Sequence, residues 1–233
     1  MNIRLFFRRI APPACVLCGA VAQHAGLCEG CRADLPWHRA PRCPQCALPT
    51  PDGQRCGACL RQPPAFDRTH AALVYAFPAD RMIPRLKYQG RLALAPALGT
   101  CLADALADVP RPDRLVPMPL HPARLRERGF NHARELARPV ARTLGIPLDA
   151  TLCTRVRDTP PQQGLAHAAR RRNVRGAFAC SADLSGQRIA VVDDVMTTGT
   201  SLDELASALK RAGAAEVQCW VVARTLPPGE PQP

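Results

Sequence analysis

The chain has 233 residues, a formal net charge of +12 and 47% hydrophobic residues. This length fits one domain of ordinary size and a small second one, and the hydrophobic content is enough for a packed core, which excludes a wholly disordered chain. No apolar stretch approaches the ~20 residues of a membrane-spanning helix, and the apolar part of residues 1–13 is too short for a signal peptide. We therefore expect a cytoplasmic protein with anionic partners, and a peripheral association with the inner face of the membrane stays open.

Residues 14–62 carry two copies of one cysteine pattern. Each copy has two Cys-x2-Cys pairs with nine residues between them, and the copies are offset by 28 residues. The cysteines are Cys15, Cys18, Cys28 and Cys31 in the first copy, and Cys43, Cys46, Cys56 and Cys59 in the second. Four thiolates suffice for one tetrahedral zinc ion, so the pattern predicts a small domain built around two structural zinc sites.

Two questions about these cysteines stay open at this point. The ligands could pair within each copy or interleave between the copies. Disulfides are the alternative to zinc, but they require an oxidising compartment that nothing in the sequence indicates. The remaining cysteines are scattered, and Cys101 and Cys219 are expected to be buried as small apolar side chains.

After a linker at residues 61–64, the pattern changes to strands that alternate with helices. The expected strands are 71–77, 115–118, 148–154, 188–192 and 216–223, and the expected helices are 91–107, 131–144 and 201–212. Pro96 should lie in the first turn of its helix, and Pro139 should kink or break the other. Such alternation predicts an α/β domain over residues 66–224, with a mostly parallel sheet covered by helices on both faces. Residues 225–233 are expected to form a disordered tail.

The most informative segment is residues 190–201. An apolar strand ends in Asp193 and Asp194, a turn rich in hydroxyls and glycine follows, and an amphipathic helix begins. A helix N-terminus binds anions such as phosphate, while ionised carboxylates accept hydrogen bonds from hydroxyls such as those of a ribose. The alternative is an ordinary capped helix, which does not explain why hydroxyls and glycine fill the whole turn.

Two basic stretches accompany this segment. A proline-rich strand end at residues 116–122 is followed by Arg124, Arg126 and Arg128, a cluster that suits pyrophosphate or is simply a solvated helix face. Residues 155–175 form a long polar and basic insertion between two strands. This insertion is a candidate active-site lid or a disordered surface loop.

The 190–201 segment resembles the ribose-phosphate loop of the type I phosphoribosyltransferases. Together with the cysteine repeat and the segments 86–91, 117–131 and 159–178, it follows the order seen in the competence protein F family (ComF, with its relative GntX). The resemblance covers about residues 14–224. It implies a double zinc ribbon on a Rossmann-like type I phosphoribosyltransferase domain.

The resemblance also implies roles for individual residues toward phosphoribosyl pyrophosphate and Mg²⁺. The acid pair would hold the ribose hydroxyls, residues 197–201 the 5-phosphate, and residues 119–121 the pyrophosphate. The implied ligand contacts are Met118, Pro119, Leu120, His121, Arg128, Asn131, Asp193, Asp194, Val195, Met196, Thr197, Thr198, Gly199, Thr200 and Ser201. The implied catalytic residues are Asp193, Asp194, Lys87, Gln162 and Arg170, of which Gln162 and Arg170 belong to the lid. Pro84 departs from the family pattern just before Lys87, and so does Ala169 before Arg170.

Three functions share this site. The first is a phosphoribosyltransferase with an unknown acceptor. The second is a competence factor that binds single-stranded DNA during DNA uptake, together with other competence or DNA-processing proteins. The third is a sensor that binds phosphoribosyl pyrophosphate without turnover. The few aromatic residues suggest that any contact with DNA is mainly electrostatic.

Overall fold

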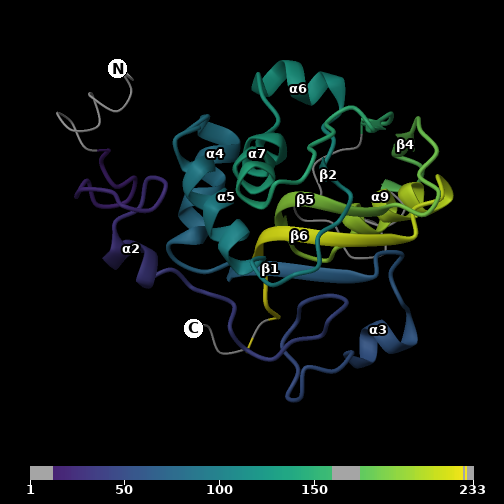
Figure 1. Ribbon diagram of the computed structural model, residues 1–233, viewed down its shortest axis with the longest axis horizontal. Helices are drawn as coiled ribbons and strands as arrows, with labels where there is room; N and C mark the ends of the chain where they lie inside the picture. Colours follow the sequence, from purple (N-terminus) through teal and green to yellow (C-terminus); the bar gives the residue numbers. More distant parts are fainter. Residues whose placement is uncertain (1–12, 159–173, 228, 230–233) are drawn as a thin grey trace.

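The computed structural model describes residues 13–158, 174–227 and 229 (Figure 1). At its centre, four parallel strands are ordered β1-β6-β5-β2. These strands are β1 (Arg68–Val74), β2 (Arg114–Pro117), β5 (Arg188–Met196) and β6 (Glu216–Arg224). The predicted parallel sheet is therefore confirmed, although β1 begins and ends three residues earlier than expected.

Helices cover both faces of the sheet (Figure 1). One face carries α4 (Ala79–Gln89), α5 (Leu94–Ala105) and α7 (His132–Leu144), and the other carries α9 (Thr200–Arg211). Along β5, Ala190 and Val192 belong to the core with α5 and α7, whereas Ile189 and Val191 belong to the core with α9. A strand buried on both faces needs consecutive apolar side chains, which explains the apolar run in the sequence.

The expected strand at 148–154 is wrong in extent and in pairing. Leu148 makes a single parallel bridge with Leu115, and only β3 (Cys153–Arg155) is a strand, paired antiparallel with β4 (Phe178–Cys180). The interruption has a local cause, because Asp149 Oδ1 accepts hydrogen bonds from the backbone N–H groups of Thr151 and Leu152. Such a turn competes with strand pairing. A disulfide joins Cys153 and Cys180 across β3 and β4, which the sequence did not reveal.

Both proline predictions concern helices that pack against each other. Pro96 lies in the first turn of α5, as predicted. Pro139 lies inside α7, but it does not break the helix, which continues to Leu144. Its ring packs against Gly99 of α5, where a Cβ atom would come within 2.3 Å of Pro139 Cγ and 2.7 Å of the Leu136 carbonyl oxygen.

Gly99→Ala is therefore expected to destabilise the protein by about 2 to 3 kcal/mol, because the added methyl group must push two packed helices apart. Urea unfolding measured by circular dichroism checks this value. Gly30→Ala is the matched control, since Gly30 lies in the short helix α2 (Glu29–Ala33) and an added Cβ meets no atom within 4 Å. Equal stability of the two variants would contradict the prediction.

The two cysteine repeats lie on opposite faces of the sheet. Between them, residues 36–38 run along the free edge of β1, where Trp37 pairs with Leu73 and the His38 N–H donates to the Ala72 carbonyl. The first repeat contributes Leu27 and Leu35 to the core with α5, and Figure 1 shows α2 beside α4 and α5. The second repeat, which includes α3 (Gly57–Arg61), lies below β1 in the same view. The repeats therefore cover the edge strand from both sides.

Candidate functional site

The acid pair lies where the chain leaves neighbouring strands in opposite directions. From β2 the chain passes to α7 on one face, and from β5 it passes to α9 on the other face. Such a switch point at the carboxyl ends of parallel strands forms a crevice that binds ligands. Asp193 and Asp194 were expected just beyond the strand, but β5 continues to Met196 and includes both. The strand pairing therefore fixes the backbone of the acid pair.

Asp194 is the most constrained carboxylate of the site. Lys87 Nζ on α4 lies 2.8 Å from Asp194 Oδ2, and His132 Nε2 on α7 lies 3.5 Å from the same oxygen. The Asp194 side chain is 4% exposed and that of Asp193 is 13% exposed. Helix α4 forms in spite of Pro84 and places Lys87 at the acid pair, so the departure in the sequence does not displace this lysine.

The charges of this group are set by burial and by the neighbouring ions. Burial and the charge of Asp194 raise the pKa of Asp193 to about 8. Burial also acts to raise the pKa of Asp194, but Lys87 and His132 outweigh it and hold this pKa well below its usual range. For Lys87, burial lowers the pKa, but the charges of Asp194 and Asp193 outweigh it and raise the pKa. Asp194 and Lys87 are therefore an ion pair at neutral pH.

His132 was missed by the sequence analysis, although it follows Asn131 directly. Its Nδ1 lies 2.8 Å from the guanidinium of Arg128. Because arginine only donates, Nδ1 must accept, and the neutral ring then carries its proton on Nε2, which faces Asp194. Burial lowers the pKa of His132, which agrees with a neutral ring. The imidazole thus orients Arg128 and Asp194 together.

The loop after the acid pair has the form that the sequence predicted. Gly199 adopts φ +77° as the N-cap of α9, and the helix begins at Thr200. The hydroxyl groups of Thr198 and Thr200 lie 2.8 Å apart. The first amides of a helix have no intrahelical acceptor, so this turn presents N–H groups and hydroxyls in one place. We call residues 197–201 the phosphate loop, after the group that the sequence analysis expects there.

The loop after β2 contributes the other side of the site. Asn131 Nδ2 donates to the Met118 carbonyl at 3.0 Å, and Asn131 Oδ1 accepts from the first amides of α7. His121 caps α6 (Pro122–Arg128) through the Ala123 N–H. These contacts hold the loop between β2 and α6, while the Arg128 guanidinium lies 5.5 Å from the ring centre of Tyr88.

These elements line a cavity of about 960 Å³ that is open to solvent. Its lining includes Lys87, Met118, Leu120, Arg128, and all residues from Asp193 to Ser201. Of the expected contacts, Pro119, His121 and Asn131 do not belong to the lining. The lining residues that the sequence analysis did not assign to the site include Tyr88, Phe130, His132, Arg155 and Asp158. The expected lid residues Gln162 and Arg170 lie outside the described residues, as does Ala169.

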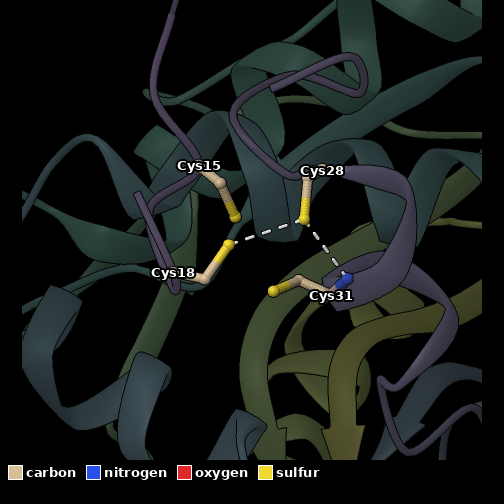
Figure 2. Close-up of side chains that lie close together, drawn as sticks. All are labelled: Cys15, Cys18, Cys28 and Cys31. Carbon is tan, nitrogen blue, oxygen red and sulfur yellow. Dashed lines mark hydrogen bonds between the residues drawn. The ribbon is translucent and has the colours of Figure 1, made fainter. Parts of the chain in front are cut away.

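Each cysteine repeat gathers its own four sulfur atoms. All four ligand atoms of each cluster lie within 4.8 Å of one another, so the ligands pair within each copy and do not interleave. The four side chains of the first repeat point toward a common centre (Figure 2). The sulfur atoms of Cys18 and Cys28, and those of Cys46 and Cys56, lie 3.6 Å apart. Tetrahedral zinc with bonds of about 2.3 Å requires about 3.8 Å between sulfur atoms, so both clusters fit zinc.

Cys101 and Cys219 are buried, as predicted. Among the described residues, no helix combines the length and apolar character needed to cross a membrane. Residues 228 and 230–233 of the predicted tail lie outside the described part of the chain.

Comparison with known families defines the class of protein. Residues 6–60 match the double zinc ribbon domain, and residues 131–231 match the phosphoribosyl transferase domain. The match agrees with the cysteine clusters and with the parallel sheet that carries the acid pair and the phosphate loop. The protein thus has a type I phosphoribosyltransferase fold with an N-terminal double zinc ribbon.

Whole-length relatives define the family. The chain is 37% identical to the DNA utilization protein YhgH of Salmonella typhi over 224 residues. This alignment covers 92% of this chain and 98% of the relative. The chain is 34% identical over 209 residues to competence protein F of Haemophilus influenzae, with 85% and 90% covered. The chain belongs to the competence protein F family. Among solved structures, the purine phosphoribosyltransferase from Pyrococcus horikoshii Ot3 aligns with 19% identity over 71% of this chain and 96% of that one, with a TM-score of 0.35.

Proposed function

We propose that this protein binds phosphoribosyl pyrophosphate with Mg²⁺ in the cavity at the acid pair, and that it serves DNA uptake or utilization. The ionised Asp194, held between Lys87 and His132 beside the phosphate loop, is the observation that carries this proposal. It combines an acceptor for ribose hydroxyls with donors for a 5-phosphate in one cavity. The names of the relatives, one a DNA utilization protein and one a competence protein, support the cellular role.

Within this proposal, each group has a defined task. The acid pair accepts hydrogen bonds from the ribose 2- and 3-hydroxyls, and the phosphate loop holds the 5-phosphate. Lys87, which contacts Asp194, and Arg128 also line the cavity and neutralise the pyrophosphate. If the ribosyl group is transferred, the carboxylates also stabilise the positive charge that develops on the ring as the pyrophosphate leaves.

The residues of the acid pair also fit a magnesium ion. Mg²⁺ prefers oxygen ligands and keeps several waters, and the carboxylates of Asp193 and Asp194 face the cavity. Because Lys87 already pairs with Asp194, Asp193 is the group that would hold the ion, and binding would displace the proton that its raised pKa retains at neutral pH. When bound, Mg²⁺ supplies charge neutralisation at the pyrophosphate.

Isothermal titration calorimetry of the zinc-loaded protein tests the binding proposal. Phosphoribosyl pyrophosphate with MgCl₂ is expected to bind more tightly than ribose 5-phosphate or pyrophosphate, because only the complete ligand engages the phosphate loop, the acid pair and the cations at once. The absence of binding heat with all three ligands would overturn the proposal. Product formation with candidate acceptors then separates a transferase from a sensor.

Single-stranded DNA is a second candidate ligand, favoured by the net charge of +12 and by exposed arginines on α7. Arg134, Arg138 and Arg142 are spaced by four residues, so they lie along one side of this helix. Trp220 is fully buried and cannot stack on bases, whereas Phe77 and Tyr88 are exposed.

The DNA proposal predicts a steep dependence of affinity on salt. Each phosphate contact contributes about −0.7 to the slope of log affinity against log salt for single strands. Substitution of Arg134, Arg138 and Arg142 by glutamine should therefore reduce the slope by about 2 if all three contact phosphates. Fluorescence anisotropy with a labelled oligonucleotide measures both slopes. A flat salt dependence of the wild type would reject the proposal.

A further inference from the structure

Arg224 joins two parts of the molecule that are far apart in the sequence. It lies at the end of β6 and is 4% exposed. Its Nε donates to the Cys46 carbonyl at 2.8 Å, within the first Cys-x2-Cys pair of the second repeat. One of its terminal nitrogens donates to the carbonyls of Met196 at 2.8 Å and Thr197 at 2.5 Å, where β5 passes into the phosphate loop. One buried guanidinium thus contacts a cysteine cluster and the candidate ligand site.

These bonds also determine which way the phosphate loop faces. In a trans peptide unit, the C=O and N–H groups point in opposite directions. When Arg224 holds the Met196 and Thr197 carbonyls, the N–H groups of Thr197 and Thr198 therefore point away from Arg224. Both threonines line the cavity, which agrees with amides that face the space where a phosphate would bind.

A second contact connects the same repeat to the same loop. Gln45, which precedes Cys46, donates through Nε2 to the Phe66 carbonyl at 3.1 Å. The Phe66 ring lies against Gly199, with Phe66 Cζ 3.7 Å from the position of a Cβ on that glycine. The neighbouring Ala65 N–H donates to Asp203 Oδ1 at 2.7 Å in the first turn of α9. The second repeat therefore supports the phosphate loop from two directions.

The first repeat is attached elsewhere. Arg32 forms an ion pair of 2.8 Å with Asp104 on α5, and Trp37 Nε1 donates to the Arg32 carbonyl. Leu27 and Leu35 pack in the core with α5, on the face opposite α9. The two cysteine clusters thus differ in what they support.

We propose that Arg224 is a positioning residue through which the second cysteine cluster holds the phosphate loop in its binding conformation. Zinc in that cluster fixes Cys46, Cys46 fixes Arg224, and Arg224 orients the amides that face the cavity. The effect on a phosphate ligand rests on the proposed function. The coupling between the second cluster and the loop does not, because it can be measured without any ligand.

The test compares Arg224→Met with the wild type in the zinc-loaded, full-length protein. Hydrogen exchange reports on amides of residues 43–47 and 196–201, a chromogenic chelator reports zinc release, and calorimetry uses ribose 5-phosphate as the probe. We expect faster exchange in both segments, faster release of one of the two zinc ions, and an affinity about tenfold lower, since charged hydrogen bonds are lost. A folded Arg224→Met protein with unchanged exchange at 196–201 would overturn the inference.

Arg42→Met is the matched control. Arg42 precedes Cys43 and ties the same repeat to the carbonyls of His38 and Ala71, but these contacts lie away from the phosphate loop. This variant should release zinc faster when the chelator is added, but while zinc stays bound it should not raise exchange at 196–201. Equal exchange at 196–201 in the two arginine variants would show that the coupling does not run through Arg224.

A second pair of variants covers the case in which Arg224→Met does not fold. Cys46→Ser opens the second cluster and Cys18→Ser the first, and the inference requires faster exchange at 196–201 only in Cys46→Ser. The same exchange in both would overturn it. The variants can show the expected changes in exchange while the wild type binds neither ribose 5-phosphate nor phosphoribosyl pyrophosphate. In that case the proposed function fails and the coupling between the second cluster and the loop stands.

Discussion

Asp194→Asn is expected to lower the affinity for phosphoribosyl pyrophosphate with Mg²⁺ at least about a hundredfold. The substitution replaces an ionised acceptor with an amide that has one acceptor oxygen, and it leaves the ammonium of Lys87 and the Nε2–H of His132 facing an uncharged group. A ribose diol would then find one acceptor fewer, and Lys87 would no longer be held in place. Calorimetry on the purified variant measures the loss.

Two further variants separate binding from folding. Asp113→Asn makes the same chemical change at the other end of the sheet, where Asp113 accepts a hydrogen bond from the Arg188 N–H, and should leave the affinity within about twofold. Lys87→Met/Asp194→Asn removes both charges of the buried pair, so it should recover stability relative to Asp194→Asn but not binding. Wild-type affinity in a folded Asp194→Asn protein would contradict the assignment of the site.

Removal of zinc is expected to unfold both cysteine repeats. A structural zinc site contributes about 10 to 16 kcal/mol of apparent binding free energy, and residues 14–62 are too short to form a sufficient core of their own. Their buried residues, such as Leu27, Leu35 and Ala47, pack in the cores of the sheet domain, and we expect this packing to be lost when the clusters open. Chelation should therefore expose the edge of β1, which residues 36–38 cover.

Metal analysis and hydrogen exchange check this expectation. The purified protein should contain two zinc ions per chain, and their removal should abolish amide protection in residues 14–62 and along β1. Restoring zinc should restore the protection, which excludes irreversible damage as the cause. Residues 14–62 that keep their protection after complete zinc loss would show that the repeats are held by packing and not by metal.

Local patterns in the sequence were enough for the elements whose causes are local. The apolar run of β5, the hydroxyl-rich turn and the amphipathic α9 all follow from neighbouring residues, and the structure has them within a few residues of the predicted bounds. The eight cysteines repeat at fixed spacing, so two sites of four ligands could be predicted. Their pairing could not, because spacing alone is compatible with an interleaved arrangement.

Errors arose where a side chain acts against the pattern. The strand at 148–154 is interrupted because Asp149 bonds to the backbone that follows it. Pro139 was expected to kink or break α7, but the helix continues through it, and its ring packs against Gly99 of another helix. Neither cause is visible in a hydrophobic pattern, since one is a competing hydrogen bond and the other a packing contact across forty residues of sequence.

By itself, the sequence determined the class of fold, the eight metal ligands, and the presence of an acid pair beside a phosphate-sized turn. Each of these depends on residue types at short separations, which the covalent chain sets directly. Only the tertiary structure decided that His132 and Lys87 meet at Asp194, and that Arg224 connects Cys46 to the phosphate loop. Those contacts join residues 28 to 178 positions apart, and they exist because the packing of helices and ribbons on the sheet brings the side chains together.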